Sequence, residues 1–263
     1  MNLIHKTLIG ASMALTGFMA QAIIIDDFLA PNPQGSLNQS CSGAGCTTAG
    51  VSAAHAPPPG TIFGLEREVF VRISGSSMFP NHSVQLDVGQ GFLSIDTGAG
   101  TTSFGIVRWD GVGSTGNFTN SGGTDATFGI NQTGVAATDF SGTAGFQVFA
   151  NFIDRPFPFT VQVFSATGWS FIDLPAPGNF GPSLLPVVGW SGFSVGGGTG
   201  VNLAGVTAIQ ALFNINNSTG PTNTATDFGI SLVRLVPTPG SLALVGAALL
   251  AMGLVGRRRR VGS

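Results

Sequence analysis

Apolar and polar residues alternate with a period of two along several stretches in the middle of the chain. Val69, Val71 and Ile73 share one face of such a stretch. Residues 84–88, 146–152, 211–215 and 228–232 show the same alternation, and segments rich in Gly, Asn, Ser and Thr separate them. This period is typical of β-strands with one face on a core. It predicts an all-β fold, a single antiparallel β-sandwich of jelly-roll-like form over residues 23–236.

The stretch from residue 31 to residue 60 breaks this pattern. It is rich in Pro, Gly, Ser and Ala, so we expect a long loop after the first strand. Both cysteines of the chain, Cys41 and Cys46, lie in it. In an exported protein, two thiols separated by four residues favour a disulfide that stiffens the loop tip. A metal site is the alternative, with His55 as the one nearby imidazole.

Residues 1–22 have the order of a secretory signal peptide. A short basic region precedes an apolar run that predicts a helix, and Ala20 and Ala22 supply the small residues of a cleavage site. The mature chain is therefore expected to begin at Ile23. The alternative interpretation is an N-terminal helix of the core.

Residues 237–263 have the order of a membrane-sorting tail. A motif that begins one residue earlier (Val236, Pro237, Thr238, Pro239) is followed by the apolar run 241–255 and four arginines (Arg257, Arg258, Arg259, Arg260). The apolar run predicts a hydrophobic helix of about 22 Å, shorter than a bilayer core of ~30 Å, although arginine side chains can snorkel. The positive-inside rule places the arginines in the cytoplasm and residues 23–236 outside the inner membrane. A buried core helix with a basic end is the alternative.

This tail resembles the PEP-CTERM sorting signal of Gram-negative bacteria in its Pro-x-Pro motif, short apolar helix and final arginine cluster. The resemblance covers about 28 residues. It implies processing near the motif by an exosortase, a membrane cysteine protease, and export to the cell surface or its exopolysaccharide matrix. Thr238 stands where glutamate is usual, which leaves open whether the tail is cleaved or stays as an anchor.

Charge and motif content exclude several classes of function. Residues 23–236 contain five arginines and all twelve acidic residues, a formal charge of −7. Nucleic-acid binding needs clustered Lys and Arg, so we expect no nucleic-acid partner. Residues 192–196 match G-x-S-x-G, but no histidine follows His82 to complete a catalytic triad. We therefore expect no enzyme.

Two sets of residues are candidates for binding. Asp26 and Asp27 lie in the first predicted strand and Asp227 begins the last one. Because terminal strands pair in many jelly rolls, these carboxylates could hold a structural calcium ion, the one cofactor that the sequence suggests. Trp109 and Trp169 could stack on sugar rings, with packing inside the sandwich as the alternative.

Short motifs of the ectodomain carry a second resemblance. The stretches at residues 25–28, 67–71, 107–111, 206–210 and 226–230 resemble other sorted surface proteins and, more distantly, jelly-roll carbohydrate-binding modules. We expect an exported, non-enzymatic structural or interaction protein of the cell surface or extracellular matrix. One alternative is a carbohydrate-binding module that acts on exopolysaccharide. Another is an extracellular glycan hydrolase or lyase that uses the recurring aspartates.

Overall fold

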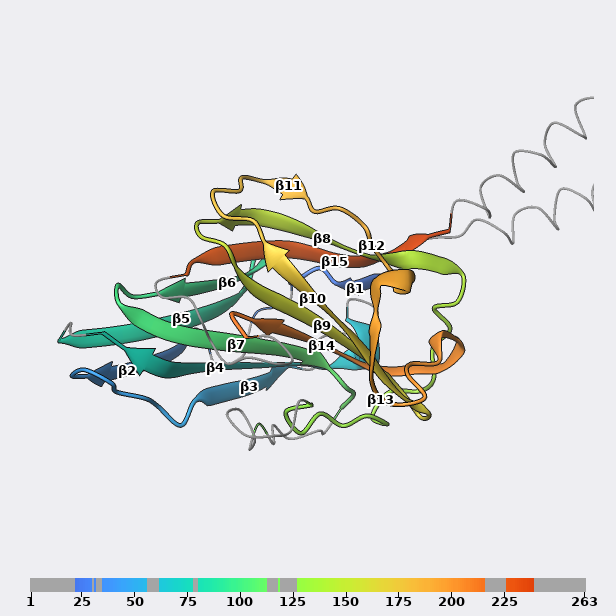
Figure 1. The fold of residues 1–263 in the computed structure, drawn as a ribbon, viewed down its shortest axis with the longest axis horizontal. Helices are drawn as coiled ribbons and strands as arrows, with labels where there is room; N and C mark the ends of the chain where they lie inside the picture. Colours follow the sequence, from blue (N-terminus) through green and yellow to red (C-terminus); the bar gives the residue numbers. More distant parts are fainter. Residues whose placement is uncertain are drawn as a thin grey trace, which may run out of the picture.

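The structure, a computed structural model, describes residues 22–29, 31, 35–55, 62–77, 80–112, 118, 127–215 and 226–238. In this part of the chain two antiparallel sheets pack face to face, which confirms the predicted all-β sandwich (Figure 1). The predicted signal helix and the predicted C-terminal helix lie outside the described residues. No helix within the described ranges is long and apolar enough to cross a membrane.

Sheet A has the strand order β11-β8-β15-β6-β5-β2, with β1 beside β15 and β12 beside β8. Its strands are β1 (Ile24–Asp26), β2 (Leu37–Ser42), β5 (Asn81–Gly89), β6 (Phe92–Thr97), β8 (Thr143–Ile153), β11 (Ser183–Leu184), β12 (Val188–Gly189) and β15 (Phe228–Pro237). The first residues of β15 pair with β6 and its last residues pair with β1. The first and last strands of the described chain therefore lie side by side.

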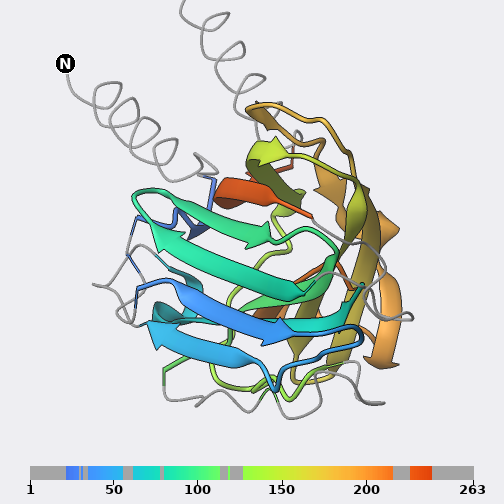
Figure 2. The ribbon, with the colours of Figure 1, turned by 90° about the vertical axis from the view of Figure 1, so that its left-hand side faces the viewer.

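Sheet B has the order β13-β10-β9-β14-β7-β4-β3. Its strands are β3 (Val51–His55), β4 (Arg67–Ser76), β7 (Thr101–Trp109), β9 (Phe157–Ser165), β10 (Gly168–Ala176), β13 (Ser194–Gly198) and β14 (Val206–Phe213). The chain crosses repeatedly between the two sheets, as from β4 to β5 and from β14 to β15, which is typical of a jelly roll. Figure 2 shows the two layers after a quarter turn.

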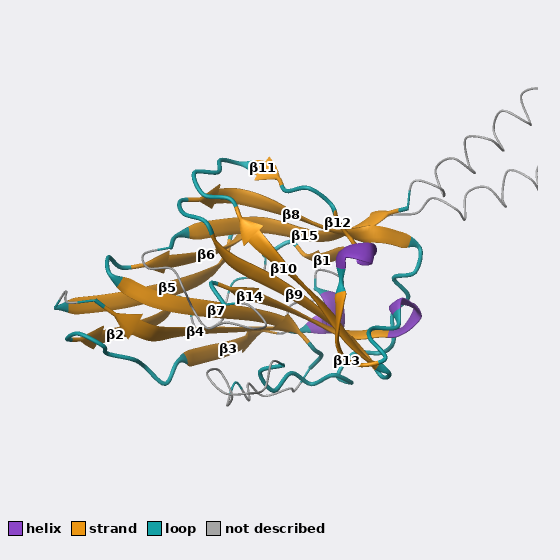
Figure 3. Cartoon of the chain, viewed as in Figure 1, coloured by secondary structure: helices purple, strands orange, loops and turns teal. Residues whose placement is uncertain are grey.

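Three short 3₁₀ helices, η2 (Phe63–Leu65), η3 (Trp190–Gly192) and η4 (Leu203–Gly205), gather at one end of the sandwich (Figure 3). At this end β1 begins with Ile24 and β15 ends with Pro237. We call it the terminal end. The opposite end, where β15 begins beside Ile153, is called the far end.

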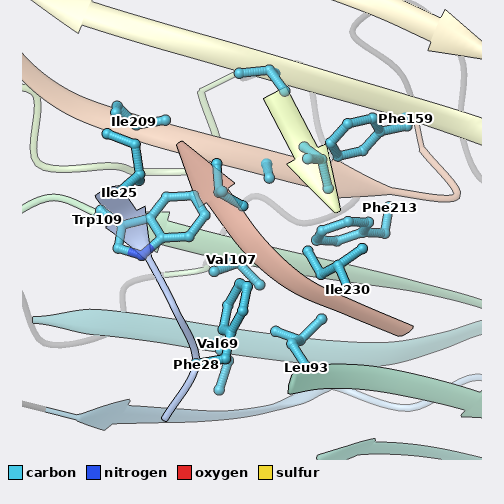
Figure 4. Packing of buried hydrophobic residues seen from close by; sticks show 14 of the residues in the cluster. Ile25, Phe28, Val69, Leu93, Val107, Trp109, Phe159, Ile209, Phe213 and Ile230 are labelled. Carbon is cyan, nitrogen blue, oxygen red and sulfur yellow. The ribbon is translucent and has the colours of Figure 1, made fainter. Parts of the chain in front are cut away.

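Aromatic side chains fill much of the space between the sheets (Figure 4). The Phe213 ring stacks on Phe159 and on Phe228, with centroids 5.1 and 4.7 Å apart. Nearer the terminal end, Ile25 and Trp109 line an apolar cavity of about 20 Å³. A space of this size is about one water molecule wide, and apolar cavities stay dry. At this cavity the described core residues therefore supply packing.

The predicted strands are confirmed at β4, β5, β8, β14 and β15. The prediction of a long loop over residues 31–60 is wrong, because β2 and β3 lie within that stretch. Each pairs with only one neighbour, β5 or β4, at the edge of its sheet. Backbone hydrogen bonds hold these edge strands, and only a few of their side chains, such as Leu37 and Ala53, are buried. Their sequences therefore lack the apolar alternation of a strand that packs on a core.

Candidate functional site

The two tryptophans predicted to stack on sugars are covered. Trp109 is 1% exposed and its Nε1 donates to Asp26 Oδ2 at 2.8 Å. Trp169 stacks on Phe164, with ring centroids 5.6 Å apart. The backbone of β13 also lies against this ring, since a Cβ placed on Gly196 would lie 2.2 Å from it, and Trp169 is 9% exposed. Both rings pack in the fold, as the alternative interpretation expected, so the sugar-stacking prediction is wrong for both.

The predicted calcium ligands are not brought together. The terminal strands do pair, but in antiparallel register, with Asp26 opposite Val233. Asp227 lies six residues earlier in the chain, about 20 Å away at the rise of an antiparallel strand. Asp26 is instead buried, and both of its carboxylate oxygens accept from Arg67 Nη1 at 3.0 Å. A calcium site shared by Asp26, Asp27 and Asp227 is therefore wrong, and the described residues contain no other group of His, Cys, Asp or Glu arranged to hold a metal.

The two cysteines form a disulfide in the structure. Cys41 is in β2 and Cys46 follows the turn after it, with Sγ atoms 2.08 Å apart. The bridge lies at the far end, because the neighbouring residue Ser42 pairs with Asn81 at the start of β5. It closes the tip where β2 leaves sheet A.

A β-bulge places one aromatic side chain on the outer surface. The sequence pattern predicts that Phe146, Val148, Ala150 and Phe152 share the core face. In the structure Ala150 pairs with Ile230 while Phe152 pairs with the preceding residue, Gly229, so β8 holds one extra residue at Asn151. Such a bulge reverses the alternation of side chains. Phe152 therefore points outward and is 42% exposed, whereas Ala150 is fully buried.

The exposed Phe152 ring lies over a glycine on the outer face of sheet A. A Cβ on Gly229 would lie 2.7 Å from Phe152 Cε1, so only glycine leaves room for the ring to lie on the backbone there. The same row of the sheet continues from Gly229 to Ser94 on β6 and then to Asp87 on β5. Neighbouring strands are about 4.8 Å apart, so the row places polar side chains beside an apolar ring over roughly 15 Å.

Three aspartates border this ring at the far end. The Thr97 amide donates to Asp227 Oδ1 at 2.6 Å, and the Asp227 amide donates to Asp154 Oδ1 at 2.7 Å. Burial raises the pKa of the Asp227 carboxyl; the Thr97 hydrogen bond opposes this shift, while Asp96 and Asp154 add to it through charge repulsion. The cluster is therefore held by backbone hydrogen bonds in spite of its like charges.

We call Phe152, Ser94, Asp87, Asp96, Asp154 and Asp227 the aromatic–acidic face. Its ring can pack on an apolar surface, and its carboxylates accept hydrogen bonds from hydroxyl groups. On the neighbouring β5, the Gln85 amide donates to Asp87 Oδ2 and orients that carboxylate. Sequence alternation alone missed the face because the bulge that creates it has no sequence marker except Gly229 in the mostly apolar strand β15.

Comparison with known proteins gives a likeness at the level of architecture. No family model and no curated protein matches the sequence. Among solved structures, a family 11 carbohydrate-binding module from Clostridium thermocellum, in complex with a β-1,3-1,4-mixed-linked tetrasaccharide, is similar at 9% identity and a TM-score of 0.38, over 82% of this chain and 96% of that one. The family 11 module of a cellulosomal cellulase from the same organism gives 10% identity and a TM-score of 0.35, over 83% and 95%. Similarity of this degree gives no correspondence between residues.

Proposed function

We propose that this protein is an exported, non-enzymatic surface protein that binds a glycan on its aromatic–acidic face. The observation that carries the proposal is the Phe152 ring, which is 42% exposed and lies against Gly229 on the outer face of sheet A. An exposed aromatic ring on a strand face matches the apolar face of a sugar ring. The neighbouring carboxylates match its hydroxyl groups, which are hydrogen-bond donors.

The geometry favours binding over glycan cleavage. Glycoside cleavage needs one carboxyl group that gives a proton to the leaving group and a second that attacks the sugar or activates water. At the far end, Asp227 Oδ1 already accepts from the Thr97 amide. Asp154 Oδ1 is already occupied by the Asp227 amide. These contacts suit a fixed surface that accepts hydrogen bonds.

Glycan binding is tested by measuring the affinity of the mature protein for a panel of oligosaccharides that includes a β-1,3-1,4-mixed-linked tetrasaccharide and exopolysaccharide fragments. We expect Phe152→Ala to weaken binding about tenfold, equivalent to roughly 1.4 kcal/mol. Gly229→Ala should weaken it as well, because the added methyl group would push the ring off the sheet. The matched control is Leu184→Ala, which removes another exposed apolar side chain of sheet A.

Two results would contradict this assignment. One is wild-type affinity in Phe152→Ala together with wild-type folding. The other is no binding by the wild-type protein to any glycan of the panel. Equal losses of glycan affinity in Leu184→Ala and Phe152→Ala would mean that the glycan does not bind specifically at the aromatic–acidic face.

The sorting part of the proposal rests on the sequence of the two ends. We propose that residues 1–22 direct export, and that the tail holds the chain at the inner membrane until an exosortase-type protease acts and releases it to the cell surface or the exopolysaccharide matrix. Pro237 is the last residue of β15 and the Thr238 amide donates to Gly142 O at 3.2 Å. A deletion that leaves the fold intact must therefore start after Thr238. Deletion of residues 240–263 should release the protein from the membrane fraction, and unchanged fractionation would contradict the role of the tail.

A further inference from the structure

The chain leaves the sandwich without a linker. Pro237 still pairs with Thr143 of β8, and Thr238 bonds to Gly142. The apolar run of the tail begins at Ser241, so only two residues separate it from the last one that is fixed to the sandwich. Three extended residue steps span at most about 10 Å. Insertion of the tail in a bilayer would therefore hold the terminal end close to the lipid surface.

Four exposed apolar side chains lie at the same end of the sandwich as this exit point. Ile24 is 49% exposed, Leu65 48%, Val112 65% and Val187 43%. They come from different parts of the sequence, so only the fold brings them to one end.

Strand pairing and backbone contacts place each of the four. Ile24 is opposite Arg234, near the end of β15, and residue 187 directly precedes β12, which pairs with the first residues of β8. Leu65 belongs to η2, which a bridge between Asp26 and Ile62 fixes to β1. Val112 lies beside it, since a Cβ on Gly64 would be 3.3 Å from the backbone nitrogen of Gly111.

Among the described residues, most charged side chains of this end are buried. Asp26, Glu66, Arg67, Glu68, Arg108 and Asp110 are all buried. Asp139 is exposed, and its carboxylate accepts from the Ser141 amide at 2.8 Å. Asp27 and Arg234 are partly exposed. Contact with lipid would therefore remove few charges from water, which keeps its cost low.

We propose that the terminal end is a lipid-contacting surface, on which Ile24, Leu65, Val112 and Val187 reach into the interfacial region of the bilayer. Four scattered side chains are too small an apolar area to bind a membrane alone. The tail supplies the anchor and raises the effective concentration of lipid at this end, so that a weak contact persists. The far end then points away from the membrane and presents the aromatic–acidic face to extracellular material.

The test uses the full chain with its tail, inserted in phosphatidylcholine vesicles with and without acyl chains brominated close to the headgroup. Val112→Trp and Val187→Trp each place a fluorescent ring at the terminal end. Phe152→Trp places one at the far end, eight residues along β15 from Pro237 and about 26 Å away. We expect bromine to remove much of the added emission of the first two variants and none of that of the third.

The quenching pattern distinguishes lipid contact at the terminal end from the other arrangements. A protein that floats with the vesicles but shows no quenching at positions 112 and 187 overturns the lipid contact and leaves glycan binding untouched. Equal quenching at position 152 also overturns it, because the whole body would then lie on the bilayer. A concentration-dependent shift in the emission of Val112→Trp in detergent, without lipid, assigns the surface to a second copy of the chain instead.

Discussion

The two ends of the sandwich differ in where their charged side chains lie: mostly buried at the terminal end and mostly in contact with water at the far end. At the terminal end, Asp26 and Arg67 are buried while Leu65 and Val112 are exposed. At the far end, the rings of Phe157 and Phe228 are buried, with centroids 4.8 Å apart. The aspartates of the far end keep contact with water on the outer face of sheet A. The terminal end is therefore built around paired internal charges, and the far end around an apolar interior with a polar surface.

With glycan binding proposed for the far end, this difference places stability and binding at opposite ends of the sandwich. A buried charge is tolerated only when partners compensate it, so the terminal end depends on specific pairs such as Arg67 with Asp26 and Arg108 with Glu68. The Arg108 guanidinium also lies 3.8 Å from the centroid of the Phe118 ring. Surface aspartates at the far end have water as an alternative partner. Substitutions there should change binding and pH dependence more than folding.

The largest expected effect follows from removal of a buried partner. Arg67→Met leaves the Asp26 carboxylate unpaired, and loss of one member of a buried ion pair costs about 3–5 kcal/mol in the free energy of unfolding. The measurement is denaturant unfolding of the mature protein. The control, Arg155→Met, changes an exposed arginine of the far end and should cost much less than Arg67→Met, because water can replace the partners of an exposed side chain.

A double variant sharpens this test. Burial raises the pKa of the Asp26 carboxyl, which Arg67, the Trp109 indole and the Phe28 amide oppose. Arg67→Met combined with Asp26→Asn removes both charges and should recover part of the lost stability. Equal losses in the single and double variants would mean that side-chain packing, and not the buried charge, dominates at the terminal end.

The sequence predicted the fold better than the site. Strict alternation at Val84, Leu86 and Val88 marks a strand with one buried face, and all three are buried. Edge strands such as β2 lack this marker because backbone hydrogen bonds, rather than apolar side chains, hold them in the sheet. Their existence follows from long-range pairing, which local composition does not encode.

Two register shifts that alternation cannot reveal change which side chains face the core, and the first of them creates the site. The bulge at Asn151 turns Phe152 outward, and a second shift between Ile230 and Leu232 turns Leu232 from the predicted core face to a half-buried position. The same limitation affected the predicted calcium ligands. Terminal strand pairing was expected, but the antiparallel register that separates Asp26 from Asp227 appears only when the strands are aligned.

A smaller effect is expected from the disulfide of the far end. Replacing both Cys41 and Cys46 by Ser removes the disulfide, which joins two residues only five positions apart in the sequence. The chain-entropy relation gives at most about 2 kcal/mol for so short a loop. Denaturant unfolding of this variant should show a smaller loss than Arg67→Met. If this variant lost as much stability as Arg67→Met, the far end would contribute as much to stability as the terminal end.

The smallest effects concern two aspartates, one at each end, with opposite signs. The pKa of Asp227 is raised, so the folded protein keeps this proton where the unfolded chain, with a pKa near 3.8, has lost it. Stability therefore falls as pH rises from about 3.8 through the folded pKa. Asp227→Asn cannot ionise, so it avoids this loss of stability. The substitution should raise the melting temperature slightly at neutral pH, but not at pH 3, where Asp227 is already protonated.

Asp139, at the terminal end, is expected to change stability with pH in the opposite direction to Asp227. Hydrogen bonds from Ser141 lower its pKa, so its stabilising contribution is present above pH 3.8 and is lost as pH falls through the folded pKa. Asp139→Asn should therefore lower the melting temperature slightly at neutral pH and leave it unchanged in strong acid. Thermal unfolding of both variants across pH 3–7 checks the signs. Shifts in the same direction would mean that the Asp227 carboxylate is stabilised by the Thr97 amide more than its acidic neighbours destabilise it.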